Sequence, residues 1–215
     1  MKNSFIVIEG LEGAGKTTLC KMVRDFLKKK SINNIMITHD PGGTPLAEKL
    51  RFLIKNGVKG EQITDKAELL MLYAARAQLI EMKIKPALAE GTWVISDRYD
   101  LSTEAYQGYG RNFHRKILTL LRKIIVKNIV PDLILYLDVT PELGLKRAQK
   151  KGKLDRIEKE SLSFFSKVRN CYLLRSKKDN SIKVIDATQP LNLVKLSLHI
   201  ILEEWWTKIK TGIRG

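Results

Sequence analysis

A glycine-rich segment near the N-terminus, residues 10–17 (GLEGAGKT), constrains this chain more than any other feature. It follows the apolar run 5–8 and opens a helical stretch, so it matches G-x-x-x-x-G-K-[ST] in the context that this motif requires. Its glycines let successive backbone N–H groups turn toward one anion, and the next helix adds its N-terminal dipole. A plain strand-to-helix turn would need neither Lys16 nor Thr17. The segment therefore predicts a binding site for a nucleoside triphosphate, with Lys16 at the outer phosphates and the Thr17 hydroxyl on Mg²⁺.

The size and hydropathy of the chain suggest one soluble domain. A chain of 215 residues can bury an ample core but is short for two α/β domains, so we expect a single domain over residues 1–215. No apolar stretch approaches the roughly 20 residues that span a bilayer, which favours a cytoplasmic protein with no membrane partner. Cys20 and Cys171 have no metal-ligand spacing, and we interpret both as core residues.

The chain is strongly basic, with 39 Lys and Arg against 23 Asp and Glu and a formal net charge of +16. Such a charge is compatible with a nucleic-acid partner, so a phosphate-loop NTPase coupled to nucleic-acid binding is an alternative hypothesis. The basic residues are scattered, however, and lack the interleaved aromatic residues that stack on bases. Solvated helix faces account for most of them, and we expect no nucleic-acid partner.

Five apolar runs of strand type alternate with segments of helical period, which indicates a parallel sheet with helices on both faces. The runs are 5–8, 35–38, 93–96, 133–137 and 182–185. Ligands of open parallel sheets gather at the carboxyl ends of the strands, so the residues after each run are candidates for chemistry. There, Asp97 is suited to the magnesium shell and Arg98 to a second phosphate, although a plain ion pair between them is also possible.

Two further segments carry charged residues of interest. Arg76 falls among apolar residues of the amphipathic stretch 65–90, so it should pair with either a carboxylate of the fold or a polar edge of a ligand. Residues 147–156 form a basic strip with a break at Gly152. They are interpreted either as a flexible lid that closes over phosphates or as a solvated helix end. The C-terminal residues 208–215 are expected to be disordered.

Taken together, these residues resemble the bacterial thymidylate kinases from Phe5 to about Pro190. The motifs that carry the resemblance are IEGLEGAGKT at 8–17, DPGGT at 40–44, YAAR at 73–76, DRY at 97–99, AYQG at 105–108 and DAT at 186–188. The resemblance implies a phosphate-loop nucleoside monophosphate kinase fold. It also implies transfer of the γ-phosphoryl group of ATP to dTMP, giving dTDP and ADP, by a cytoplasmic homodimer of dTTP synthesis.

The resemblance also assigns residue roles, with Arg98 and Arg51 at the dTMP phosphate, Arg76 at the thymine edge and Tyr106 against the sugar. As catalytic residues it implies Lys16, Arg98, Arg147 and Lys151. As ATP contacts it implies Gly10, Leu11, Glu12, Gly13, Ala14, Gly15, Lys16, Thr17, Thr18, Ala187, Thr188 and Gln189. As dTMP contacts it implies Glu12, Asp40, Arg51, Leu72, Arg76, Arg98, Thr103, Tyr106 and Gln107. As ligands of Mg²⁺ it implies Thr17 and Asp97.

The chain departs from the family pattern at several positions. Leu72 stands where the family usually has a phenylalanine stacked on thymine, which predicts a higher KM for dTMP or looser base choice. His39 replaces an arginine and Asp40 a glutamate. Gln149 and Lys151 replace arginines in the lid, and a lysine lacks the bidentate fork, so a slower phosphoryl step is expected. These departures are also compatible with a kinase-derived binding protein that has lost its activity. Lys16 and the other phosphate-site residues argue against this alternative, because a protein without catalysis would not need all of them.

Overall fold

The computed structural model describes residues 3–150 and 152–211, and its centre is a five-stranded parallel sheet with strand order β2-β3-β1-β4-β5. The strands are β1 (Phe5–Gly10), β2 (Ile35–His39), β3 (Trp93–Asp97), β4 (Leu133–Asp138) and β5 (Ile182–Asp186). Each contains one of the five predicted runs, so the predicted α/β fold with a parallel sheet is confirmed. Every residue of the central strand β1 is buried, as expected for a strand covered on both faces.

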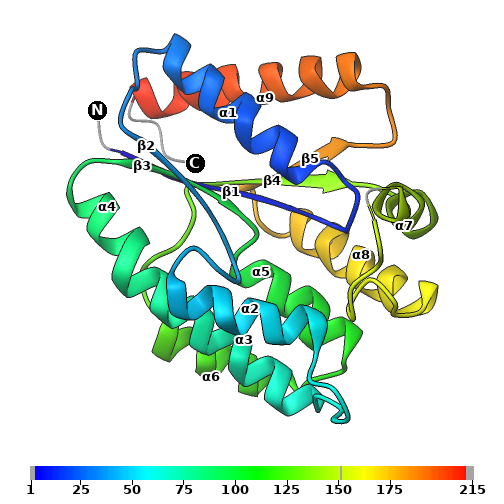
Figure 1. Cartoon of the computed structure of the whole chain (residues 1–215). Coiled ribbons are helices and arrows are strands. Elements are labelled where there is room, and N and C mark those ends of the chain that lie inside the picture. The colour runs from blue at the N-terminus through cyan, green and yellow to red at the C-terminus, as the bar shows by residue number, and fades with distance from the viewer. Residues whose placement is uncertain (1–2, 151, 212–215) are drawn as a thin grey trace.

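Helices cover both faces of the sheet (Figure 1). They are α1 (Lys16–Lys29), α2 (Pro45–Asn56), α3 (Asp65–Leu79), α4 (Lys85–Ala89), α5 (Asp100–Thr103), α6 (Arg115–Ile125), α7 (Pro141–Gln149), α8 (Leu162–Ser176) and α9 (Leu191–Thr211). Two π-helical segments, η1 (Ile80–Ile84) and η2 (Glu104–Gly110), extend α3 and α5. In Figure 1, α1 and α9 lie on one side of the sheet, and α4, α5 and α8 lie on the other.

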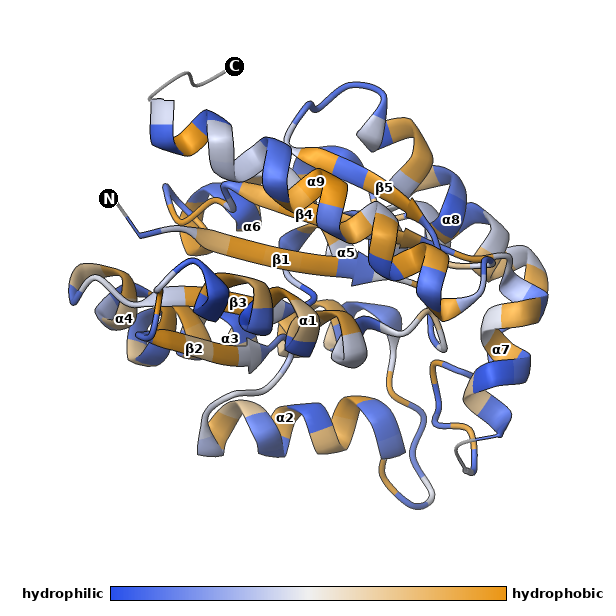
Figure 2. Ribbon diagram, turned by 90° about the horizontal axis from the view of Figure 1, so that it is seen from above, coloured by the Kyte–Doolittle hydropathy of each residue, from blue (hydrophilic) through white to orange (hydrophobic). Residues whose placement is uncertain are grey.

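Local sequence explains where the helices begin. Thr44, Thr64 and Thr140 cap α2, α3 and α7 by accepting a hydrogen bond from a backbone N–H three residues later. Proline occupies the first turn of α2 and α7, where its missing N–H costs nothing. The apolar strands and the inward faces of the helices, coloured orange in Figure 2, then pack into one large core cluster.

The C-terminal helix α9 is longer than the sequence predicted. Residues 208–215 were expected to lack order, but α9 continues to Thr211. The added turn is supported because Ile209 packs against the core and the Lys210 ammonium lies 5.9 Å from the centre of the Trp206 ring. Residues 212–215 lie outside the described residues.

Parallel register brings the polar strand ends to one edge of the sheet. Asp97 of β3 is level with Ile8 of β1 and with His39 of β2. Asp138 of β4 is level with Asp186 of β5. Within residues 3–150 and 152–211, no helix has both the length and the hydropathy that a bilayer span requires.

Candidate active site

The phosphate loop connects β1 to α1 with an unusual backbone. Gly13 and Gly15 adopt positive φ angles of 70° and 100°, a region that glycine enters at little cost. A side chain at Gly13 would also collide with the carbonyl of Gly144 in α7. Position 13 therefore requires glycine for two physical reasons, its positive φ angle and the close packing of the loop against α7.

Lys16 begins α1 and folds back over the phosphate loop. Its Nζ donates hydrogen bonds to the carbonyl oxygens of Gly10 and Leu11, at 3.1 and 2.8 Å. Burial, reinforced by the nearby positive charge of Arg98, lowers the pKa of Lys16 to about 8. A bound phosphate would oppose both effects, so this lysine is poised to gain an anionic partner.

Thr17 and Asp97 meet where β3 ends beside α1. The Thr17 hydroxyl donates to Asp97 Oδ2 at 3.1 Å across 80 positions of sequence. Among the described residues, no group of three or more His, Cys, Asp or Glu side chains could hold a metal ion without other ligands. A hydroxyl, one carboxylate and substrate phosphates form the kind of oxygen set that Mg²⁺ accepts. The residues present therefore fit a magnesium ion that arrives with a nucleotide.

A cavity of about 600 Å³ opens beside the phosphate loop and gathers most of the predicted site residues. This volume is in the range of small-molecule sites. The predicted residues that line it are Glu12, Gly13, Gly15, Lys16, Thr17, Thr18, Asp40, Arg51, Leu72, Arg76, Asp97, Arg98, Thr103, Tyr106 and Gln107. The other predicted phosphate-loop residues, Gly10, Leu11 and Ala14, are buried and are not part of its lining.

Arg98 donates hydrogen bonds within the cavity to acceptors from the phosphate loop, α5 and η2. Its NH2 group donates to Glu12 Oε1 at 2.8 Å and to the Tyr106 hydroxyl at 3.0 Å, while NH1 donates to Ser102 at 3.1 Å. The same Tyr106 hydroxyl donates to Glu12 Oε2 at 2.7 Å. Glu12 is thus an ion-pair partner of the Arg98 guanidinium, the group that was expected to bind a phosphate. The sequence alone did not predict this ion pair.

Arg76 is almost fully buried and has several acceptors. Its Nε donates to Asp40 Oδ2 at 2.5 Å, and NH2 donates to Thr103 Oγ1 at 2.8 Å. NH1 reaches Asp100 Oδ1 at 3.3 Å, and NH2 also reaches the carbonyl of Tyr99. Of the two partners that the sequence left open, the carboxylate of the fold is therefore present. Asp40 Oδ1 is buried without a hydrogen-bond partner among the described residues, and an unpaired buried acceptor at a cavity points to a ligand donor.

Sequence reasoning missed the buried carboxylate of Glu68 in α3. It accepts hydrogen bonds from Gln107 Nε2 at 2.8 Å, from two nitrogens of Arg111 and from Arg156 of the lid. Burial would raise the pKa of Glu68, but hydrogen bonds from the two arginines and the Arg111 charge outweigh burial and lower it. A sequence signal existed: positions 68, 72 and 76 recur at i, i+4, so Glu68 shares a helix face with Leu72 and Arg76.

Glu9, the residue before the phosphate loop, is also buried and was not predicted. It accepts hydrogen bonds from the backbone N–H groups of Tyr99 and Ser102 and from the hydroxyls of Ser102 and Tyr172. Burial raises the pKa of this carboxyl, while the Arg98 charge opposes the rise. These contacts fix the start of α5, which carries Ser102 against Arg98.

Other predicted residues lie away from the cavity wall. Arg147 is in the last turn of α7, and its NH1 donates to the carbonyl of Ala187 at 2.7 Å. Thr188 and Gln189 follow in the same loop and hydrogen-bond Asp186. Arg147 is thus directed at the loop after β5. Lys151 lies outside the described residues.

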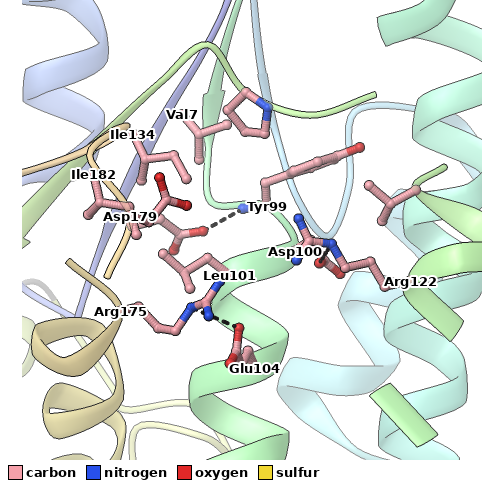
Figure 3. Close-up of a pocket in the computed structure, with 13 residues that line it drawn as sticks. Val7, Tyr99, Asp100, Leu101, Glu104, Arg122, Ile134, Arg175, Asp179 and Ile182 are labelled. Carbon is pink, nitrogen blue, oxygen red and sulfur yellow. Dashed lines mark hydrogen bonds and ion pairs between the residues drawn. The ribbon is translucent and has the colours of Figure 1, made fainter. Parts of the chain in front are cut away.

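Another, much smaller cavity is lined by residues of β1, β4 and α5, among others (Figure 3). Its walls include the ion pairs Asp100–Arg122 at 3.2 Å and Glu104–Arg175 at 3.4 Å. Its volume is about 40 Å³, enough for a few water molecules and far too little for a nucleotide. The small cavity is therefore not a candidate for the predicted nucleotide site.

Comparison with known proteins gives the same family twice. A family model described as thymidylate kinase matches residues 8–198. The chain is also similar to the crystal structure of thymidylate kinase from Ehrlichia chaffeensis, with a TM-score of 0.74 and 28% sequence identity. That match covers 94% of this chain and 99% of the other chain. The region matched by the family model contains the phosphate loop, the large cavity and the loop after β5.

Proposed function

The chain belongs to the thymidylate kinase family and is an ATP-dependent kinase that phosphorylates dTMP, and we propose that both nucleotides meet in the 600 Å³ cavity. One observation carries this proposal: the cavity joins the phosphate-loop residues Lys16 and Thr17 to the arginines Arg98 and Arg76. Two phosphate-binding regions in one cavity suit transfer between two nucleotides. The whole chain then acts as one kinase domain.

The ATP half is formed by the phosphate loop and the loop after β5. Backbone N–H groups of residues 13–18 bind the triphosphate, and Lys16 bridges its outer phosphates. Residues 187–189 lie against the adenine. Arg147 connects these two regions, because its helix packs on Gly13 while its guanidinium bonds Ala187.

The dTMP half is formed by α2, α3 and η2. Arg98 binds the dTMP phosphate, which takes the place of the Glu12 carboxylate on the guanidinium. Arg51, whose NH1 donates to Pro41 O at 2.8 Å, makes a second phosphate contact. Leu72, Thr103, Tyr106 and Gln107 then surround the sugar and base.

The residues act by positioning and electrostatics, without a covalent intermediate. Mg²⁺, when bound with ATP, neutralises phosphate charge. Thr17 and Asp97 hold that ion, while Lys16 and Arg98 stabilise the charge that develops on the migrating phosphoryl group. The lid, with Lys151, completes the positive surround and excludes water.

A homodimer is supported by exposed apolar side chains on α3 and α6. Leu70 is 60% exposed, and Ile117, Leu120 and Ile124 are 47%, 58% and 54% exposed. Positions 117, 120 and 124 recur at i, i+3 and i+7 and so share one side of α6, and α3, which carries Leu70, packs on α6 through Tyr73 and Leu118. An apolar face of this kind suits a symmetric partner. A cytoplasmic location agrees with a role in dTTP synthesis.

The test is an ADP-release assay with ATP, Mg²⁺ and a panel of dTMP, dUMP, dCMP, dGMP and AMP, each with and without DNA. Turnover should depend on dTMP and ignore DNA. Turnover that ignores every monophosphate but rises with DNA would instead favour the nucleic-acid-dependent NTPase, which none of the comparisons supports.

A further inference from the structure

We propose that Glu68 is a positioning residue that fixes which end of the Gln107 amide faces the thymine base, and that it shares its carboxylate with the lid through Arg156. This inference rests on the proposed role of Gln107 beside the base. It adds to that role a residue that sets the direction of the hydrogen bond.

Among the described residues, Glu68 is the hydrogen-bond partner of the Gln107 side-chain nitrogen. Glu68 has a side-chain exposure of 1%, and Gln107 an exposure of 3%. Both residues line the large cavity. Gln107 Nε2 donates to Glu68 Oε1 at 2.8 Å, while no donor among the described residues pairs with Gln107 Oε1. Gln107 therefore binds the fold with its nitrogen and leaves its oxygen for a ligand.

Charge makes this orientation a requirement. The two arginines lower the pKa of Glu68, so at neutral pH it is an ionised carboxylate that only accepts hydrogen bonds. If the amide were flipped, the side-chain oxygen of Gln107 would face the carboxylate oxygen of Glu68. Two buried acceptors would then lie together without a donor between them, which costs more free energy in a buried site than in water. The ligand-facing atom of Gln107 is thus an acceptor.

An acceptor at this place matches thymine. In dTMP the base offers one hydrogen-bond donor, the N3–H group, between two carbonyl acceptors. Cytosine carries an unprotonated nitrogen at the same ring position, which would repel the Gln107 oxygen. Fixing the amide therefore selects thymine over 5-methylcytosine, although both bases carry the same methyl group.

The second Glu68 oxygen connects the base pocket to the lid. Arg156 donates to Glu68 Oε2 and, through Nε, to the carbonyl of Ile54 at 2.9 Å. Its backbone N–H donates to Lys55 O at 2.9 Å, and Asp155 pairs with Lys55 at 3.0 Å. These contacts place the lid on the C-terminal carbonyls of α2, where positive charge is favoured.

The experiment measures kcat/KM for dTMP and for 5-methyl-dCMP and takes their ratio. In Glu68→Gln, the new side chain can offer either an oxygen or a nitrogen to Gln107, so the Gln107 amide can flip. The ratio should fall by at least about tenfold relative to the wild type. The matched control is Glu160→Gln, which removes another ion pair of Arg111, at 2.6 Å, without touching Gln107. Its ratio should stay within about twofold of the wild type.

The results distinguish the orienting role of Glu68 from a purely structural role and from the role of Gln107 at the base. A merely structural role for Glu68 would lower kcat/KM for both substrates equally and leave the ratio unchanged, which would overturn the proposal. If Gln107→Leu leaves the ratio unchanged, the proposed role of Gln107 at the base fails instead. If Glu68→Gln does not fold, Glu68→Asp keeps the charge for the arginines but withdraws the oxygen from Gln107. It should still lower the ratio, and an unchanged ratio would contradict the inference.

Discussion

Arg76 and Asp40 form a buried ion pair, with Arg76 Nε 2.5 Å from Asp40 Oδ2 and side-chain exposures of 1% and 0%. They lie 36 positions apart, on α3 and in the turn after β2. Burying both charges is costly unless they remain paired. The pair therefore fixes the turn that carries Asp40 to α3, which lines the large cavity.

Removing one partner should destabilise the fold. Asp40→Asn leaves the Arg76 charge without its shortest contact, so we expect the free energy of unfolding to fall by about 3 kcal/mol. Urea denaturation followed by circular dichroism measures the change. Glu48→Gln, on a carboxylate exposed by 47% in the first turn of α2, should cost less than about 1 kcal/mol. Equal losses in the two variants would contradict the importance of the buried pair.

Nucleotide affinity should depend on pH through Lys16. The pKa of Lys16 is lowered to about 8 in the free enzyme, and bound phosphates favour the charged form. Below pH 8 the lysine is already charged, so the affinity for ATP should be nearly constant. Above pH 8 binding must take up a proton, and the affinity should fall by up to about tenfold per pH unit.

Titration calorimetry in two buffers of different ionisation enthalpy detects this proton uptake at pH 8.5. In Lys16→Arg the side chain stays charged, so the pH dependence in this range should disappear. An affinity for ATP that is flat from pH 7 to pH 9 in the wild type would show that Lys16 does not titrate there.

Leu72 should limit recognition of the base. It lines the cavity with an exposure of 8%, and a phenylalanine there would add an aromatic contact of about 1 kcal/mol. Leu72→Phe should therefore lower the KM for dTMP about fivefold and raise the preference for dTMP over dUMP. Steady-state kinetics with both substrates tests this, and the prediction fails if the variant changes neither quantity.

The hydrogen bond between Thr17 and Asp97, 3.1 Å long, should set the requirement for Mg²⁺. Asp97→Asn removes the negative charge beside the ion, so half-maximal activity should need about tenfold more Mg²⁺. Thr17→Ser keeps the hydroxyl and should leave this requirement near the wild-type value. An unchanged magnesium titration for Asp97→Asn would remove Asp97 from the metal site.

Charge on the exposed face of α6 should prevent dimerisation. Leu120→Glu places a carboxylate within the proposed interface, where burial without a partner is unfavourable, and should give a monomer by light scattering. Leu196 of α9 has a similar exposure, 56% against 58%. Leu196→Glu should therefore leave the oligomeric state as in the wild type. A dimer that survives Leu120→Glu would place the interface elsewhere.

The sequence by itself determined the features that depend on neighbours along the chain. The phosphate loop, the five strands and the capped start of α7 follow from glycine placement, apolar runs and the Thr140–Pro141 pair. The predicted parallel arrangement of the strands then implied that Asp97 and Arg98 would lie at the carboxyl edge of the sheet, where ligands of such sheets bind. All of these arise from periodicity and backbone preference, which act over a few residues.

Only the tertiary structure decided how charges are paired across the site. Arg76 meets Asp40, Arg98 meets Glu12 across 86 positions, and Glu68 collects Gln107, Arg111 and Arg156. A basic residue in a sequence has many carboxylates available, and its partner depends on which helices the sheet brings together. A buried charge must find a partner, but the fold alone determines which one, because the contact forms between segments far apart in the chain.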